Sequence, residues 1–232
     1  MFTFTKISLA RTIASCGTAL IMSTGMGITA TSVQASTLGF ADIVLDFFNS
    51  GANPAFPNPN DSYGGDGINF PVPVSTDVVL GDAPTNFADS LSLPTGSFVI
   101  VGFLDEVIID GSGNDLSVRE IGGGGERAQV FISSLLSNDM SDFTFLGIAQ
   151  DDLTTSFDLG SIGFTDPVRS VKIVGLDNFG GSPGFDLVNV EGLPGSFKSV
   201  PEPATTLGIG LSMGLMGYLK KKQSRKLKQA KN

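Results

Sequence analysis

The sequence predicts an all-β protein: a single β-sandwich of jelly-roll type between an N-terminal signal peptide and a C-terminal transmembrane helix. Short apolar or alternating segments recur at intervals of roughly ten to fifteen residues and are separated by glycine-rich turns, a spacing typical of sandwiches. No stretch between these segments has the length and period of an amphipathic helix. The chain has 18 phenylalanines and no tryptophan, so phenylalanine should dominate the core.

The first 35 residues have the three parts of a signal peptide. Lys6 and Arg11 form a positive start, an uncharged stretch of small and apolar residues follows over Ile13–Ala30, and Val33-Gln34-Ala35 places small residues before the cut. We expect signal peptidase to cleave after Ala35. An uncleaved membrane anchor is the alternative.

Composition limits the chemistry of the exported part, residues 36–199, which has a suitable length for one domain. The only cysteine, Cys16, lies in the signal peptide, and the chain has no histidine. Disulfides, thiolate metal sites, Ser-His-Asp catalysis and histidine-bound zinc are therefore excluded. A glycoside hydrolase that uses carboxylates alone is the remaining enzymatic option, and our expectation is a protein that is not an enzyme.

The exported part is strongly acidic. It holds every Asp and Glu except Glu202 and only five of the 14 basic residues, for a formal charge of about −17. Such a charge disfavours nucleic-acid binding and attracts divalent cations. A merely solvated acidic surface is the other interpretation.

Residues 36–94 are expected to be the loop-rich half of the sandwich. Phe40–Phe48 is predicted as an opening strand, Pro54, Pro57 and Pro59 exclude regular structure, and Gly64–Gly67 continues the loop. Prolines limit Phe70–Val74 to an edge strand at most. Five phenylalanines through this half should need a core to cover them, namely Phe47, Phe48, Phe56, Phe70 and Phe87.

Residues 95–193 are expected to hold regular strands. Ser97–Phe103 is continuously apolar, as in a strand buried on both faces, and Ala128–Ser133 alternates so that Val130 and Ile132 share one face. The other predicted strands are Leu116–Glu120, Phe143–Gly147, Thr155–Leu159, Val168–Val174 and Asp186–Glu191. Gly122–Gly125 is interpreted as a turn between two strands, because no Lys-Ser/Thr follows it as in a phosphate loop.

The segment Asp105–Asp115 is the predicted metal site. Asp105, Asp110, Asn114 and Asp115 offer the carboxylate and amide oxygens that calcium prefers. Asp186, with Asp177, could complete the site if the ends of the strands meet. The segment does not match an EF-hand, and a plain polar turn explains Asp110–Asp115 equally well. Calcium is thus a possible cofactor.

The C-terminal segment predicts where in the cell the protein is located. Val200-Pro201-Glu202-Pro203 precedes the uncharged run Ala204–Leu219 and a basic end at 220–232. As a helix the run spans about 24 Å, somewhat less than the roughly 30 Å of a bilayer core, a deficit that lysine snorkelling can cover. The basic end should stay in the cytoplasm and the bulk of the chain outside.

These three parts, in this order, resemble a PEP-CTERM sorting tail. The resemblance implies a bacterial envelope protein held in the inner membrane by its tail and cut near the Pro-Glu-Pro by an exosortase-type membrane peptidase. It would then reach the cell surface or the extracellular space. A permanent anchor without processing is the alternative.

The second half is similar to a module that recurs in PEP-CTERM surface proteins. The similarity lies in Gly102-Phe103, Asp115-Leu116 before a strand ending at Glu120, Phe157-Asp158-Leu159 and Gly184-Phe185-Asp186-Leu187. It implies a sandwich like those of carbohydrate-binding modules and discoidin-like domains, many of which hold calcium. Ser134–Asp142 departs from the commoner pattern, which has a tight Asp-Gly turn there.

Three functions follow as hypotheses. The first is a non-enzymatic surface or matrix protein that associates with exopolysaccharide, in a form that could depend on calcium. The second is a structural protein that associates with itself and binds no small ligand. The third is a glycosidase with two acids on one concave face.

Overall fold

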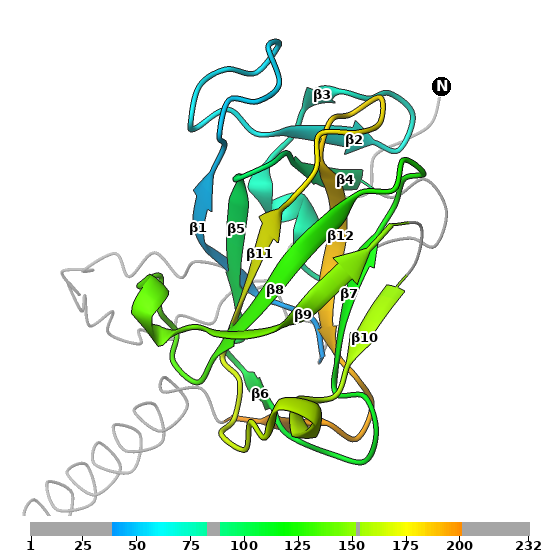
Figure 1. The fold of residues 1–232 in the computed structure, drawn as a ribbon. Coiled ribbons are helices and arrows are strands. Elements are labelled where there is room, and N and C mark those ends of the chain that lie inside the picture. The colour runs from blue at the N-terminus through cyan, green and yellow to red at the C-terminus, as the bar shows by residue number, and fades with distance from the viewer. Residues whose placement is uncertain (1–38, 83–88, 152–153, 201–232) are drawn as a thin grey trace, which may run out of the picture. The chain divides into compact units, whose positions relative to one another are not determined.

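The computed structural model describes residues 39–82, 89–151 and 154–200 (Figure 1). The chain divides into two compact units, Met1–Gln34 and Ala35–Asn232, and every described residue belongs to the second. The described part is all-β, with two antiparallel sheets packed face to face, so the predicted all-β sandwich is confirmed.

One sheet has five strands in the order β1-β5-β11-β8-β9. It is the sheet nearer the viewer in Figure 1, and its edges are β1 and β9. The strands are β1 (Ile43–Phe48), β5 (Phe98–Gly102), β11 (Ser170–Gly175), β8 (Arg127–Ser133) and β9 (Thr144–Gln150).

The other sheet has six strands in the order β10-β7-β12-β4-β2-β3. A separate pair, β13 with β6, lies at one end of the sandwich. The strands of the six-stranded sheet are β10 (Thr154–Phe157), β7 (Leu116–Glu120), β12 (Phe185–Gly192), β4 (Asp89–Leu93), β2 (Tyr63–Asp66) and β3 (Val72–Pro73). The separate pair consists of β13 (Phe197–Ser199) and β6 (Glu106–Ile108).

The core lies between the sheets and follows from the alternation of side chains along each strand. In β8, Val130 and Ile132 are fully buried in it, as predicted, and Val118 and Leu187 reach it from the six-stranded sheet. Ile100 of β5 is also fully buried although it is not part of this core cluster. The apolar run 97–103 therefore marks a strand buried on both faces.

All eight of the predicted strands are found; β7 has the predicted bounds, and the other seven have ends shifted by a few residues. The loop after β1 is irregular, and β3 is an edge strand as its prolines require. The prediction of a loop over Gly64–Gly67 is wrong for its first three residues, which belong to β2. Gly64 pairs with Leu91 of β4, a strand that was also not predicted.

Phenylalanine burial in the first half differs from the prediction. The ring of Phe56 stacks on Tyr63, with 4.6 Å between centroids. Phe70, however, is 66% exposed and Phe48 is 39% exposed, so the core does not cover these two rings. Phe87 lies outside the described residues.

The helices of the described part are three short 3₁₀ turns: η1 (Thr76–Val79), η2 (Met140–Asp142) and η3 (Leu159–Ile162). Among the described residues, no helix has the length and apolar character needed to cross a membrane. The predicted signal peptidase site at Ala35, the motif residues Pro201, Glu202 and Pro203, and the predicted span all lie outside the described residues. Val200 is described, and its amide donates to the Asp105 carbonyl.

Candidate functional site

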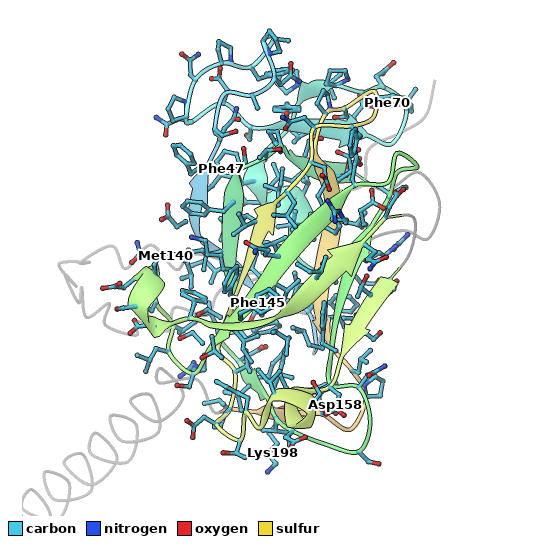
Figure 2. The ribbon with its side chains drawn as sticks, viewed as in Figure 1. Phe47, Phe70, Met140, Phe145, Asp158 and Lys198 are labelled. Carbon is cyan, nitrogen blue, oxygen red and sulfur yellow. The ribbon has the colours of Figure 1, made fainter. Side chains whose placement is uncertain are left out.

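Three connections meet at one end of the sandwich: the β7–β8 loop, residues 121–126, the β11–β12 loop, residues 176–184, and the β2–β3 turn, residues 67–71. The hydroxyl of Tyr63 in β2 donates to the Pro183 carbonyl over 2.7 Å, which ties the β11–β12 loop to β2. Gly124 lies against Gly180 of the same loop. Figure 2 shows Phe70 at this end of the sandwich and Asp158 at the opposite end.

Glu120, Glu126 and Asp151 form what we call the acid cluster. Each contributes a carboxylate oxygen, and these three oxygens lie within 4.8 Å of one another. Glu120 ends β7, Glu126 precedes β8 and Asp151 follows β9. Because β7 and β8 belong to different sheets, the loop that joins them crosses the end of the sandwich and brings its two glutamates together.

The acid cluster is largely shielded from water. Glu126 is 1% exposed and Glu120 is 4% exposed, while Asp151 is half-buried. Glu126 Oε1 and Asp151 Oδ1 accept no hydrogen bond from any described residue. The other Asp151 oxygen, Oδ2, accepts from the Gly125 amide. Buried carboxylate oxygens without a donor are costly and need an explanation.

The surroundings of Glu126 and of Asp186 oppose ionisation of these two carboxyl groups. The pKa of Glu126 is raised to about 8, chiefly by burial and then by the charges of Asp186, Glu120 and Asp151, while a hydrogen bond from the Gly184 amide lowers it. Burial also raises the pKa of Asp186 to about 7, although the Ser92 hydroxyl donates to this carboxylate. Arg127 is next to Glu126 in the chain, but its guanidinium pairs with Asp177 over 3.0 Å.

Two glycines leave room around the acid cluster. A Cβ on Gly180, whose φ is +78°, would lie 2.6 Å from Glu126 Oε1, and one on Gly122 would collide with Glu120 Oε1. Side chains at these two positions would displace the carboxylates. The glycine-rich composition of the loops therefore has a local reason at the cluster.

Two exposed rings, Phe70 and Phe179, form what we call the aromatic rim. Phe70 is 66% exposed and Phe179 is 54% exposed, and Ile68 beside them is 86% exposed. The Phe70 ring lies against Gly181, where a Cβ would be 2.7 Å from it, and the β-carbon of Phe179 faces Gly124. Gly180, which faces Glu126, and Gly181, which faces the Phe70 ring, thus connect the buried carboxylates with the aromatic rim.

The predicted site residues lie at several places. Asp110 and Asp115 come together with Asp158, one carboxylate oxygen of each within 4.8 Å of the others. Asp115 is fully buried, and both of its oxygens are occupied. They accept from the Gly111 amide at 2.8 Å, the Ser196 hydroxyl at 2.7 Å and the Leu159 amide at 2.9 Å. Asp115 thus joins three segments of chain by hydrogen bonds, and a cation would have to compete with these donors.

The other three predicted residues are not in this Asp115 group. Asn114 is exposed beside it. Asp105 precedes β6. Its neighbour Glu106 has a pKa raised to about 8, chiefly by burial and then by a hydrogen bond with the Asp105 side chain. Asp186 lies on β12, and its charge raises the pKa of Glu126. The anticipated meeting of Asp186 with Asp110 and Asp115 is therefore not what the structure shows.

Glu120, Glu126 and Asp151 were not predicted as site residues. The available signal was a pair of glutamates around four glycines, Glu120-Ile-Gly-Gly-Gly-Gly-Glu126. A turn within one sheet would have left both glutamates at the surface. What makes them a buried pair is the crossing between sheets, which the sequence does not reveal.

No protein-family model and no curated protein matches the chain. Among solved structures, the chain is similar to the CBM32 of AlyQ in complex with 4,5-unsaturated mannuronic acid, with a TM-score of 0.32 and 11% identity over 45% of this chain and 77% of that one. It is also similar to truncated AlyQ with CBM32 and alginate lyase domains, with a TM-score of 0.30 and 14% identity. That overlap covers 49% of this chain and 27% of the other. Neither similarity says which residues of this chain bind a ligand.

Proposed function

We propose that this is an exported, non-enzymatic surface protein whose β-sandwich associates with exopolysaccharide through the aromatic rim. In this proposal signal peptidase removes residues 1–35, the PEP-CTERM tail holds the chain in the inner membrane, and an exosortase-type peptidase processes it near Pro201-Glu202-Pro203. The protein then acts at the cell surface or in the extracellular matrix.

The aromatic rim is the observation that carries the proposal. Large apolar side chains are normally buried, so Phe70 and Phe179 at 66% and 54% exposure, close together at one end of the domain, mark an interaction surface. Aromatic faces stack against the C–H faces of sugar rings. An extended polysaccharide suits an open platform better than an enclosed pocket.

A polysaccharide partner also agrees with the charge of the domain. With about −17 formal charges on the exported part, the protein repels anionic partners such as nucleic acids at long range. A neutral polymer meets no such repulsion, and an acidic polymer would need a divalent cation between the two surfaces. Calcium dependence is part of the proposal for this reason.

The acid cluster does not favour a glycosidase. A hydrolase of that type needs both carboxyl groups in contact with the scissile bond, roughly 5 to 9.5 Å apart. Glu120 and Glu126 are 4% and 1% exposed, so a polymer cannot reach both of them in this conformation. We therefore propose binding without hydrolysis.

The direct test is a binding titration of the full chain, purified in mild detergent, against the exopolysaccharide of the producing organism, with calcium and with a chelator. We expect saturable binding that weakens by at least about tenfold when Phe70→Ala and Phe179→Ala are combined. The matched control is Phe145→Ala, another exposed ring on a different surface. Absence of binding under both conditions, or equal loss in the control, would refute the proposal.

Sorting is tested separately in the producing cell. N-terminal sequencing should find Ser36, and mass spectrometry of the released protein should find a C-terminus near residue 201 that depends on the peptidase. A protein that keeps residues 204–232 at the surface would instead support the permanent anchor.

A second candidate function, structural self-association, is favoured by the outer face of the five-stranded sheet. Phe145 is 47% exposed there and packs edge-on against Phe131, and Met140 on η2 beside the sheet is 50% exposed (Figure 2). Phe48 stacks on Phe98 of the same sheet. If this face joins two copies, sedimentation should show dimers that Phe145→Ser abolishes and Phe179→Ser does not; monomers at all concentrations would exclude it.

A further inference from the structure

We propose that the acid cluster of Glu120, Glu126 and Asp151 binds one divalent cation, with calcium as the ion that fits best. This site differs from the Asp110–Asp115 segment that the sequence indicates. It does not depend on polysaccharide binding, because its ligands lie under the β7–β8 and β11–β12 loops and not on the exposed rim.

The spacing of the oxygens fits a single calcium ion. Calcium–oxygen distances of about 2.3 to 2.6 Å allow two ligands of one ion to lie up to roughly 5 Å apart. The three carboxylates each place an oxygen within 4.8 Å of the others, so one ion can touch all three. Magnesium, at about 2.0 to 2.1 Å and with strict octahedral geometry, requires a tighter set and usually keeps several waters.

The unsatisfied oxygens are the independent observation that points to a ligand. Glu126 is 1% exposed, and its Oε1 accepts no hydrogen bond from the described residues. Asp151 is half-buried, but its Oδ1 atom is shielded from water and also accepts no hydrogen bond from them. By contrast, both Asp115 oxygens at the other end are occupied by hydrogen-bond donors. Only the acid cluster, of these two groups, leaves buried acceptor capacity that a cation would fill.

The nature of the donors selects the kind of ion. Three carboxylates carry up to three negative charges, and Asp186 adds a fourth near Glu126. Carboxylate oxygens suit hard cations, whereas zinc and copper prefer the nitrogen and sulfur ligands that the exported part lacks, since it has neither histidine nor cysteine.

A cation here would connect the loops at this end of the sandwich. Its ligands come from the end of β7, the start of β8 and the turn after β9, and the Gly125 amide already holds Asp151. Gly124 in the same loop lies against Gly180, which follows Phe179 of the aromatic rim. Ordering the β7–β8 loop would therefore also position that ring.

The test uses the full chain in detergent, stripped with a chelator and then titrated with CaCl₂ by calorimetry at physiological salt. We expect a dissociation constant of about millimolar or lower, in the range of extracellular calcium modules. Glu126→Gln keeps the shape and removes the charge, and it should weaken binding at least about tenfold and abolish the rise in melting temperature with calcium. Asp110→Asn, in the Asp115 group, is the control and should bind as the wild type does.

Terbium luminescence supplies a second readout that identifies the position of the ion. Tyr63 is near the cluster, since Glu126 and Asp186 both act on its hydroxyl, and the exported part has no other tyrosine or tryptophan. Bound Tb³⁺ should therefore emit on tyrosine excitation, and Tyr63→Phe and Asp151→Asn should each remove the emission. If Glu126→Gln fails to fold, Asp151→Asn, at a half-buried position, takes its place in the titration.

Three results would overturn the inference. These are no calcium binding at millimolar concentration, unchanged binding in Glu126→Gln and Asp151→Asn, and binding lost in Asp110→Asn instead. Polysaccharide takes no part in these measurements. A protein that binds calcium but no polysaccharide would refute the proposed function alone.

Discussion

Asp115 shows how one buried carboxylate can be structural although its sequence context suggests a metal ligand. Its two oxygens accept from Gly111, Ser196 and Leu159, which lie on three different connections at one end of the sandwich. Charged groups that accept backbone hydrogen bonds in the interior stabilise a fold more than neutral ones do. Asp115, which the sequence predicts as a calcium ligand, therefore also joins three loops by hydrogen bonds.

Asp115→Ala should destabilise the domain by about 3 kcal/mol, because three donors would lose their acceptor in a buried position. Urea unfolding followed by tyrosine fluorescence or circular dichroism measures the loss. Asn114→Ala is the control and should stay within about 0.5 kcal/mol of the wild type, since Asn114 is exposed. An equal effect in the two variants would contradict the structural role of Asp115.

The buried acids predict an unusual dependence of stability on pH. Glu126 and Glu106 have pKa values raised from 4.5 to about 8, and Asp186 from 3.8 to about 7. Each of these carboxyls keeps in the folded state a proton that the unfolded chain releases, so their contribution to the free energy of unfolding should be largest below about pH 4 and fall between about pH 4.5 and 8.

Urea unfolding in chelator at about pH 5 and about pH 8 tests this prediction. The protein should be less stable at the higher pH, and Glu126→Gln should reduce the difference. Calcium should also reduce it if the ion binds the acid cluster. Stability that rises over this interval would show that the acids are ionised in the folded state.

At the scale of the elements, β2 and β4 show where the strand pattern fails. Gly64-Gly65 in β2 lacks side chains that could alternate, and Asp89-Ser-Leu-Ser-Leu in β4 follows a segment rich in turn residues. Gly64 packs so closely on the Ser90 carbonyl that no Cβ fits there. The glycines that suggested a loop are the residues that allow the two strands to pair.

Gly64→Ala should therefore break the β2–β4 pairing and destabilise the domain by about 2 to 3 kcal/mol, because the added methyl meets backbone and not a movable side chain. Thermal unfolding gives the magnitude. Gly123→Ala is the matched control, since a Cβ there meets nothing within 4 Å. Equal melting temperatures for the two variants would contradict the close packing.

The strands of the second half were predictable because the burial of each strand face determines the pattern of apolar residues along the strand. A strand buried on both faces must be apolar throughout, as 97–103 is, and a strand with one buried face must alternate, as 128–133 does. The short strands β6 and β13 pair with each other across the chain, and a three-residue segment carries too little pattern to be recognised.

At the scale of the whole molecule, the class of fold could be predicted but the position of the candidate site could not. Composition and spacing indicate a sandwich, whereas the acid cluster depends on which sheet each strand joins. Asp186, predicted as a partner of Asp110 and Asp115, lies instead with Ser92 and acts on Glu126. Two sites at opposite ends of a sandwich look equally plausible when only the order of acids along the chain is known.

The distribution of charge and targeting signals also belongs to this scale. The strongly acidic charge of residues 36–199 and the basic terminal segments agree with the proposal that the domain is exported and acts outside the cytoplasm. The proposed function combines export to the cell surface with polysaccharide binding by the exposed rings at one end of the domain.

Hydrogen–deuterium exchange of the full chain, with and without the producing organism's exopolysaccharide, tests the central claim most directly. If the aromatic rim binds the polymer, peptides that cover residues 67–71 and 176–184 should exchange more slowly in its presence, with a larger effect in calcium. Peptides from the outer face of the five-stranded sheet, such as those around Phe131 and Phe145, should not change. Protection confined to that sheet, or to the loops around Asp115, would contradict binding at the rim.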